Sequence, residues 1–380
     1  MQTKLIPLFF AGLCVLALCL CAGCVGIPDA GDGTINITDS FGRVVTIPDN
    51  PEKIAVSGSG SMRYFIYLDV DLGKIAAVDY SDSALNIYPE DPRPYMLANH
   101  QILNISEVGA SRGVVDGEKL LTSGAEILFI AASSEASIES ANEIQDKTGI
   151  PVVLYYTGDY VTQKEKVCDS LEMLAAILHK ETRYQELTAY FTSVENDLTS
   201  RVANVSVSDE RAYVGGISYR GEHGLDGTNP TYYPFTVLHA NNVASNLSNV
   251  GQTEYALVSK EQILAWDPEI IFVGLGTLNA AGGGAIYELQ NDVSYKTLTA
   301  AKTGEVYMVN PDISAGANYE TQLVNAYYIG KVLYPEQFAD VDIAKKADEI
   351  YNKVVGGDVY EELKEHMNGL SYQKADLSAI

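Results

Sequence analysis

The chain has 380 residues, of which 47% are hydrophobic, and a formal net charge of −25 at pH 7. This hydrophobic content excludes a disordered protein. The negative charge argues against a nucleic-acid partner, because the chain would repel phosphates.

Residues 1–23 have the layout of a secretory signal peptide. Lys4 precedes an apolar run from Leu5 to Leu20, which is shorter than the roughly 20 residues that a spanning helix needs. The linker 24–34 follows without a stop-transfer pattern, so a cleaved signal is favoured over an uncleaved membrane anchor. Both alternatives place the rest of the chain outside the cytoplasm.

Four of the five cysteines lie at or before position 24. The sequence 21–24, Cys-Ala-Gly-Cys, has no second pair to complete a redox or zinc site. It resembles a lipobox in which Cys24 is diacylated, although Cys21 stands where a lipobox usually has Leu. Cys168 then remains alone, so no internal disulfide is expected, and its apolar helical setting predicts a buried structural role.

Short β-rich runs alternate with helical patterns on both sides of a central helical segment. This alternation predicts an α/β fold of two lobes with doubly wound parallel sheets. We expect a first lobe at 35–160, a helical segment at 161–204 and a second lobe at 205–380. The expected strands are 53–57, 74–79, 127–131 and 152–156 in the first lobe, and 212–217, 243–247, 270–273 and 305–309 in the second.

The central segment has apolar residues spaced by threes and fours from Val167 to Leu198. This spacing predicts two helices separated by a polar turn at 179–182. The second helix would be about 33 Å long, which is enough to bridge two lobes. Two ordinary helices packed inside one lobe would satisfy the same periodicity.

The two halves also share a short sequence pattern. Glu118-Lys-Leu-Leu precedes the expected strand 127–131 at the same spacing at which Glu261-Gln-Ile-Leu precedes 270–273. Each copy predicts a short helix, a turn and a buried strand, so the lobes look like related units built twice.

Catalytic and nucleotide-binding motifs are absent from the sequence: it has no HExxH, GxSxG, P-loop or EF-hand pattern. The five histidines do not cluster at ligand spacing, and the GxG at 58–60 lacks the third glycine of a dinucleotide fingerprint. We therefore expect a binding protein, with no enzyme activity, no resident metal and no intrinsic cofactor.

Polar and aromatic residues follow the expected strands, where ligands of open α/β sheets bind. Residues 57–64 could open a helix whose free N–H groups face an anion. Arginines beside tyrosines suit a large planar or anionic chelate, and Arg63 and Arg220 are the best candidates for its charge. His223 is either a metal ligand or a hydrogen-bonding residue. The candidate ligand-binding residues are Ser61, Arg63, Tyr64, Tyr80, Arg112 and Tyr156 from the first lobe, and Tyr219, Arg220, His223, Tyr232 and Tyr319 from the second.

These features together resemble the periplasmic-binding protein family that serves ABC importers of iron-siderophores, haem and vitamin B12. The resemblance rests on residues 37–48 and 51–56, on Val108-Gly109, on the paired Glu118 and Glu261 patterns, and on residues 333–338. It implies two α/β lobes joined by one rigid helix, with the ligand in the cleft between them. It also implies docking on a permease dimer that a cytoplasmic ATPase energises.

Within that family the resemblance ranks a ferric siderophore first as ligand, a corrinoid such as vitamin B12 second, and haem third. Family members use one glutamate per lobe to engage permease arginines, which makes Glu118 and Glu261 the candidate docking residues. The alternative is that both glutamates only stabilise the first turn of their helices. We expect a monomer, anchored by lipid to the outer face of the cytoplasmic membrane. An exported metal chelatase and a structural surface lipoprotein are the competing classes.

Overall fold

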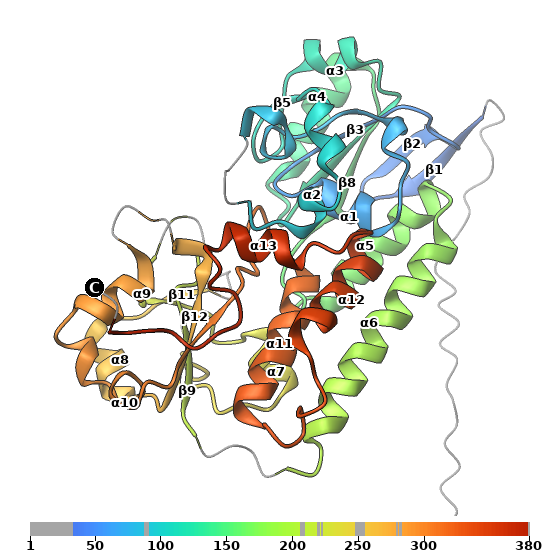
Figure 1. Ribbon diagram of the computed structural model, residues 1–380. Helices are drawn as coiled ribbons and strands as arrows, with labels where there is room; N and C mark the ends of the chain where they lie inside the picture. The colour runs from blue at the N-terminus through green and yellow to red at the C-terminus, as the bar shows by residue number, and fades with distance from the viewer. Residues whose placement is uncertain are drawn as a thin grey trace, which may run out of the picture.

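Two parallel β-sheets, one from each half of the chain, form the centres of two lobes (Figure 1). The computed structural model describes residues 33–86, 91–205, 210–218, 221, 223–247, 255–278, 280 and 283–378. The expected signal peptide, Cys24, Tyr219 and Arg220 lie outside these residues. The expected α/β class with two lobes and parallel sheets is confirmed.

The sheet of the first lobe has the strand order β4-β3-β7-β8, with all strands parallel. Its strands β3 and β8 are buried along their whole length, as expected for a sheet covered on both faces. The four expected strands are confirmed, with the bounds β3 (Ile54–Ser57), β4 (Ile75–Ala77), β7 (Ile127–Ala132) and β8 (Val152–Tyr156).

Shorter elements surround this sheet. The antiparallel hairpin of β1 (Thr34–Thr38) and β2 (Val44–Pro48) opens the lobe. A small antiparallel ribbon, β5 (Gly109–Ala110) with β6 (Val114–Val115), precedes the helix α3. The helices are α1 (Met62–Tyr67), α2 (Pro94–Leu97), α3 (Gly117–Ser123) and α4 (Ser137–Thr148).

The sheet of the second lobe has the order β13-β12-β9, again parallel. Its strands are β9 (Ala212–Gly215), β12 (Ile270–Gly274) and β13 (Val306–Val309). The ribbon of β10 (Gly227–Thr228) and β11 (Ala256–Leu257) precedes the helix α8. The helices are α7 (Tyr233–Val237), α8 (Lys260–Trp266), α9 (Gly284–Asn291) and α10 (Thr299–Thr303).

The strand expected at 243–247 does not form, and this prediction is wrong. The Asn242 side chain accepts a hydrogen bond from Ala244 N at 3.0 Å, and Leu247 N donates to Ala244 O at 3.1 Å. These local bonds build turns in place of a strand. Asn242 still forms one parallel bridge with Ala212 of β9, so it occupies the edge position that β4 occupies in the first lobe.

The two expected central helices are confirmed as α5 (Lys164–Ile177) and α6 (Glu181–Val202). Near the start of α6, Arg183 Nε donates to Tyr67 O of the first lobe at 2.9 Å. Near its end, Arg201 pairs with Asp340 of the second half at 2.6 Å. The helix α6 therefore touches both halves, and Figure 1 shows it along one side of the molecule.

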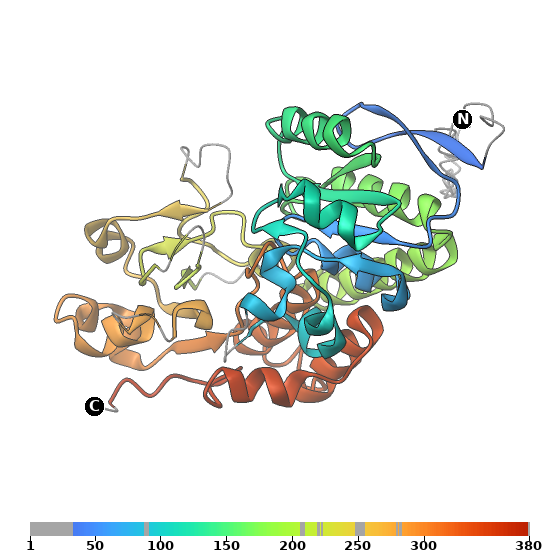
Figure 2. The same cartoon turned by 90° about the horizontal axis from the view of Figure 1, so that it is seen from above.

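Three further helices complete the chain: α11 (Tyr319–Leu333), α12 (Ile343–Val355) and α13 (Tyr360–His366). The last two return to the first lobe, where Asn99 Nδ2 donates to Val355 O at 3.1 Å and His366 Nδ1 lies 2.9 Å from Asp91 O. Figure 2 shows these C-terminal helices beside the first lobe. No helix in the described part of the chain is long and apolar enough to cross a membrane.

Candidate functional site

The loops after β3 and β13 meet where the two lobes touch, a region we call the seam. A Cβ atom added to Gly60 would lie 1.9 Å from Ala315 O, so only glycine permits this approach. Arg63 of α1 crosses the seam, and its Nη2 donates to Asn318 Oδ1 at 2.8 Å and to Ser314 O at 3.1 Å. The Arg63 side chain is buried, with 3% exposed. An incoming anion would have to displace these acceptors to reach the guanidinium.

Tyrosine side chains continue the seam on both sides of this arginine. The Tyr64 hydroxyl lies 3.1 Å from the Tyr319 hydroxyl, which donates to Gly158 O at 2.7 Å. Tyr67 donates its hydroxyl proton to the Glu320 carboxylate. Burial raises the pKa of Tyr64 and Tyr67, so both hydroxyls stay neutral donors. Hydrogen bonds between the lobes therefore hold α1 against α11.

Two carboxylates that follow β4 accept hydrogen bonds from backbone amides at the start of α1. Gly58 N donates to Asp79 Oδ2 at 2.7 Å, and Met62 N donates to Asp82 Oδ2 at 3.2 Å. Asp82 is completely buried, and Arg93 lies 3.1 Å from it as its counter-charge. The sequence predicted free N–H groups facing an anion here, and this is wrong for these two donors, because the first lobe satisfies them internally.

Arg112 lies at the carboxyl edge of the first sheet, on the turn between β5 and β6. The next amide, Gly113 N, donates to Asp79 Oδ2 at 3.2 Å and ties this turn to the end of β4. The Arg112 side chain is exposed. Of the seven arginines that the structure describes, the other six have hydrogen-bonded or ionic partners and Arg112 has none. Tyr80, also after β4, is half-buried and donates to Leu85 O at 3.1 Å.

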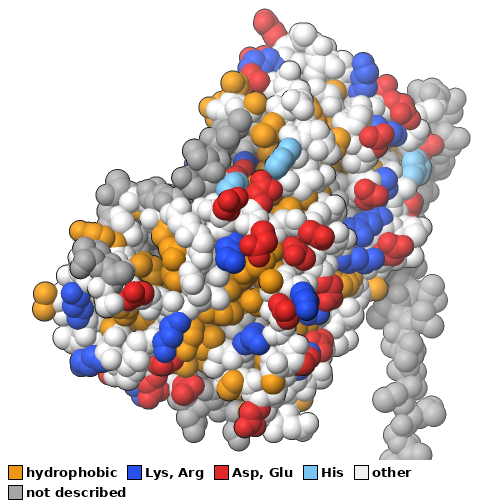
Figure 3. All heavy atoms as spheres, in the orientation of Figure 1, with side chains coloured by type: hydrophobic (Ala, Val, Ile, Leu, Met, Phe, Trp, Pro, Cys, Tyr) orange, Lys and Arg blue, Asp and Glu red, His pale blue; other side chains and the backbone are white. Residues whose placement is uncertain are grey.

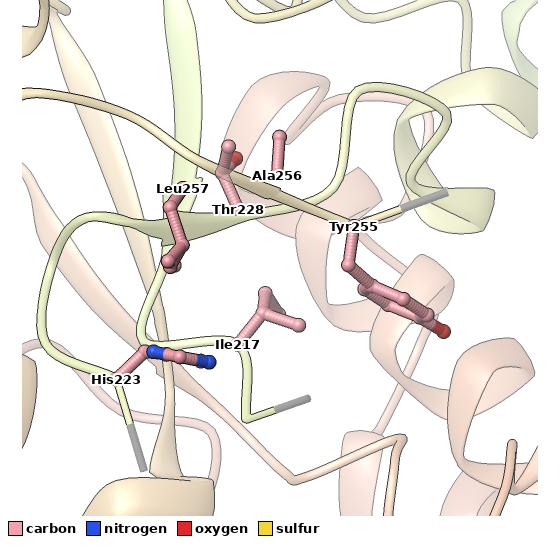
Figure 4. Close-up of a pocket in the computed structure, with 7 residues that line it drawn as sticks. Ile217, His223, Thr228, Tyr255, Ala256 and Leu257 are labelled. Carbon is pink, nitrogen blue, oxygen red and sulfur yellow. The ribbon is translucent and has the colours of Figure 1, made fainter. Parts of the chain in front are cut away.

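A cavity of about 250 Å³ lies on the second lobe beside His223 (Figure 4). A Cβ atom added to Gly227 would lie 2.7 Å from His223 Cβ, so the glycine lets the histidine pack over β10. Leu257 extends from β11 toward the side of the cavity that holds the His223 ring. The cavity is mostly apolar, and its lining residues are Ile217, His223, Gly227, Thr228, Tyr255, Ala256 and Leu257.

The remaining candidates from the sequence lie inside the lobes. Tyr232 is 1% exposed and its hydroxyl accepts from Asn325 Nδ2 at 3.2 Å, so it belongs to the core of the second lobe. Tyr156 is buried and donates to Gln163, and Ser61 is buried at the start of α1. The structure thus gathers Arg63, Tyr64 and Tyr319 at the seam. It leaves Tyr80, Arg112 and His223 with surface that solvent can reach.

Several residues of this region were missed by sequence reasoning. Asp79 ends an expected strand, so the rule that polar residues after strands line a site would have found it. Asn318 and Glu320 carried no such signal, since they open a helix far along the chain and meet Arg63 only across the seam.

Acidic side chains are spread over both lobes on the face that Figure 3 shows. Among the described residues, no group of three or more His, Cys, Asp or Glu side chains is placed to hold a metal ion. In this acidic molecule, an exposed arginine without a counter-ion is an attractive contact for an anionic ligand.

Comparison with known proteins identifies relatives along most of the chain. The family model of the periplasmic binding proteins matches residues 128–313. The molybdate-binding protein MolA of Haemophilus influenzae is 23% identical over 337 residues, which are 83% of this chain and 90% of MolA. The solved structure of MolA bound to molybdate has a TM-score of 0.63 at 22% identity and covers 84% of this chain and 97% of that one.

Two further solved structures share the fold at lower similarity. The TroA-like periplasmic binding protein FepB from Veillonella parvula has a TM-score of 0.61 at 19% identity and covers 85% of this chain and 96% of that one. The periplasmic haem-binding protein HutB of Vibrio cholerae has a TM-score of 0.53 at 19% identity, with 74% and 99% covered.

Proposed function

We propose that this chain, a member of the periplasmic binding protein family and a substrate-binding component of an ABC importer, captures an anionic metal chelate of the ferric siderophore class. The family consists of non-enzymatic transport components that work outside the cytoplasm, so the competing chelatase reading is set aside. The site would lie between Arg112 and Tyr80 on the first lobe and the cavity at His223 on the second.

The observation that carries this proposal is the unpaired, exposed Arg112 at the carboxyl edge of the first sheet. A charge-assisted hydrogen bond from a guanidinium to a ligand oxygen stabilises a complex by about 1.5–3 kcal/mol. Arg220, which also follows a strand, was predicted to act in the same way from the second lobe.

The lining of the cavity supports an organic chelate over a bare oxyanion. Ile217, Ala256 and Leu257 offer apolar contacts and no hydrogen-bond donors from their side chains. A metal wrapped in an organic ligand can bury its apolar shell against these three side chains, whereas a bare dianion gains no contact from them. Molybdate is the second candidate, because MolA binds it and is similar over most of the chain.

A ligand panel tests the proposal. Purified protein is mixed with a ferric siderophore, molybdate, haem or cobalamin, and binding is measured by native mass spectrometry and calorimetry. We expect the ferric siderophore to bind most tightly. Tighter binding of molybdate would select the second candidate. Tightest binding of haem, with His223 as its axial ligand, or of cobalamin would select that chelate as the ligand. If the protein bound none of the four ligands, the proposed function would be contradicted.

Two further parts of the proposal concern the membrane and the permease. Cys24 would carry the lipid, so protein from membranes should lack residues 1–23 and have added acyl mass; an intact Met1 without lipid would contradict this. Glu118 and Glu261, both exposed in the first turns of α3 and α8, would contact the permease dimer.

A further inference from the structure

Both lobes carry the same structural unit: a two-stranded ribbon, a short helix and a buried strand. The unit is β5–β6, α3 and β7 in the first lobe, and β10–β11, α8 and β12 in the second, where α7 lies between β10 and β11 in the chain. Asp116 caps the first helix two residues before Glu118, and Ser259 caps the second two residues before Glu261. The strands β7 and β12 each begin nine residues after their glutamate. The duplication seen in the sequence thus extends to the ribbon and the cap.

An exposed aliphatic side chain occupies the same position in both units, four residues before the glutamate. Val114 of β6 is 61% exposed and Leu257 of β11 is 64% exposed. Neither belongs to the apolar core of its lobe. A single exposed aliphatic residue needs no explanation, but the repetition at one register of two lobes indicates a surface that meets a partner.

The charged residues that follow these two aliphatic residues are also alike in the two units. Glu118 and Glu261 make no side-chain hydrogen bond or ion pair with any residue that the structure describes. The lysines next to them are already paired, Lys119 with Glu107 at 2.5 Å and Lys260 with Asp292. Each unit therefore carries one unneutralised carboxylate four residues after one exposed aliphatic side chain.

We propose that Val114 and Leu257 are the apolar centres of the surface that docks on the permease dimer, with Glu118 and Glu261 as its charged rim. This inference rests on the proposed function. Two like patches on related lobes suit a partner with two-fold symmetry, which offers two like recesses. Such recesses would be apolar at the centre and basic at the edge, which is the usual anatomy of a protein interface.

The position of Leu257 adds a consequence for ligand transfer. Leu257 also lines the cavity beside His223. A permease subunit that covers Leu257 would therefore lie against the rim of that cavity. Docking at this position places the translocation path next to the second-lobe part of the proposed ligand site.

The test replaces each aliphatic residue with a polar one. Val114→Ser, Leu257→Ser and the double variant are assayed for binding to the cognate permease–ATPase complex in lipid nanodiscs. We expect each single variant to bind about five- to tenfold more weakly, as for a side chain at the centre of an interface. This loss should persist at high salt. The loss caused by Glu118→Gln and Glu261→Gln should shrink at high salt, because rim charges are screened.

Val44→Ser is the matched control, since Val44 is 65% exposed and lies on β2, outside both units. It should bind the permease normally, and all variants should unfold like the wild type. Normal docking by the double variant would overturn the inference. The inference would also be wrong if the serine variants lost affinity only for the ligand, because Leu257 would then act at the ligand site alone. Weaker binding to permease-free liposomes with normal binding to the permease complex would contradict it as well.

A second comparison separates this inference from the proposed function. If Glu118→Arg with Glu261→Arg abolishes docking while the serine variants dock normally, the transport function stands and only the apolar centres are wrong. If the wild-type protein does not bind the permease complex at all, both the inference and the proposed function fail.

Discussion

Arg112 has an unusual backbone conformation as well as an unpaired side chain. Its φ is +66°, in the left-handed region that side chains other than glycine rarely adopt. The hydrogen bond from Gly113 N to Asp79 holds the turn in place. A non-glycine residue kept in this region is a common feature of ligand sites, where the surrounding structure offsets a strain of about 1–3 kcal/mol.

Removal of this guanidinium should therefore weaken ligand binding without affecting the fold. We expect Arg112→Ala to raise the Kd for the bound chelate by about tenfold or more, because one charge-assisted hydrogen bond is lost. Arg112→Lys, which keeps the charge, should lose less. Calorimetry measures both, and equal affinity of wild type and Arg112→Ala would contradict the assignment.

Asp312 is a buried acid near the seam. Burial raises its pKa to about 7, although a hydrogen bond from Gln322 opposes the shift. The folded protein therefore keeps this proton up to about pH 7, while the unfolded chain releases it near pH 4. The stability that Asp312 contributes is present below pH 4 and is lost as the pH rises to about 7.

Replacement of this acid should flatten the pH dependence of folding. Between pH 5 and pH 8 the unfolding free energy of the wild type should fall by about 2–3 kcal/mol more than that of Asp312→Asn. Denaturant unfolding at several pH values measures the difference. Asp340→Asn is the control, because hydrogen bonds from Arg201 lower the pKa of Asp340 to about 2, outside this range. Parallel curves for wild type and Asp312→Asn would contradict the prediction.

At the scale of elements, the contact of α1 with α11 decides how the lobes are held. The Arg63 guanidinium lies over the Tyr95 ring, 4.8 Å from its centre, and bonds to carbonyl and amide oxygens of the second half. The loop before α11 therefore depends on a residue of the first lobe. Arg63 was predicted as a ligand contact, and its bonds across the seam suggest a structural role that a variant can separate from binding.

Removal of the Arg63 guanidinium should weaken the contact between the two lobes at the seam. We expect Arg63→Met to lower the unfolding free energy by about 3 kcal/mol, because several buried acceptors lose their donor. Small-angle X-ray scattering should then show a larger radius of gyration. Arg211→Met is the control, since Arg211 is exposed and paired with Glu269, and it should cost less than about 1 kcal/mol. Unchanged stability with weaker ligand binding would instead assign Arg63 to the ligand.

At the scale of the whole molecule, the duplicated units place a similar short helix at the outer end of each lobe. Figure 1 shows α3 at the end of the first lobe and α8 at the end of the second. Each helix begins with a side chain that accepts hydrogen bonds from its first amide groups, so the glutamates can stabilise the first turn only through the helix dipole. This arrangement favours a docking role for Glu118 and Glu261 over a purely local one.

Charge reversal at both ends should therefore stop transport. Glu118→Arg with Glu261→Arg should abolish uptake in whole cells while unfolding and ligand affinity stay normal. Glu139→Arg is the control, because Glu139 is also an exposed first-turn glutamate, on α4, and has no counterpart in the duplication. Normal uptake by the double variant, or loss of ligand affinity alone, would show that the glutamates do not dock.

The sequence by itself determined the α/β class, seven of the eight expected strands, the two central helices and the duplication, because each depends on local periodicity and spacing. It failed at 243–247, where the Asn242 side chain satisfied the backbone locally. Only the tertiary structure decided which candidates are buried. Arg63 and Arg112 were both predicted as ligand contacts because they lie in loops after strands. In the structure Arg63 is buried across the seam, whereas Arg112 faces solvent. Burial and pairing depend on residues about 250 positions away, such as Asn318 for Arg63, and no local pattern encodes contacts at that separation.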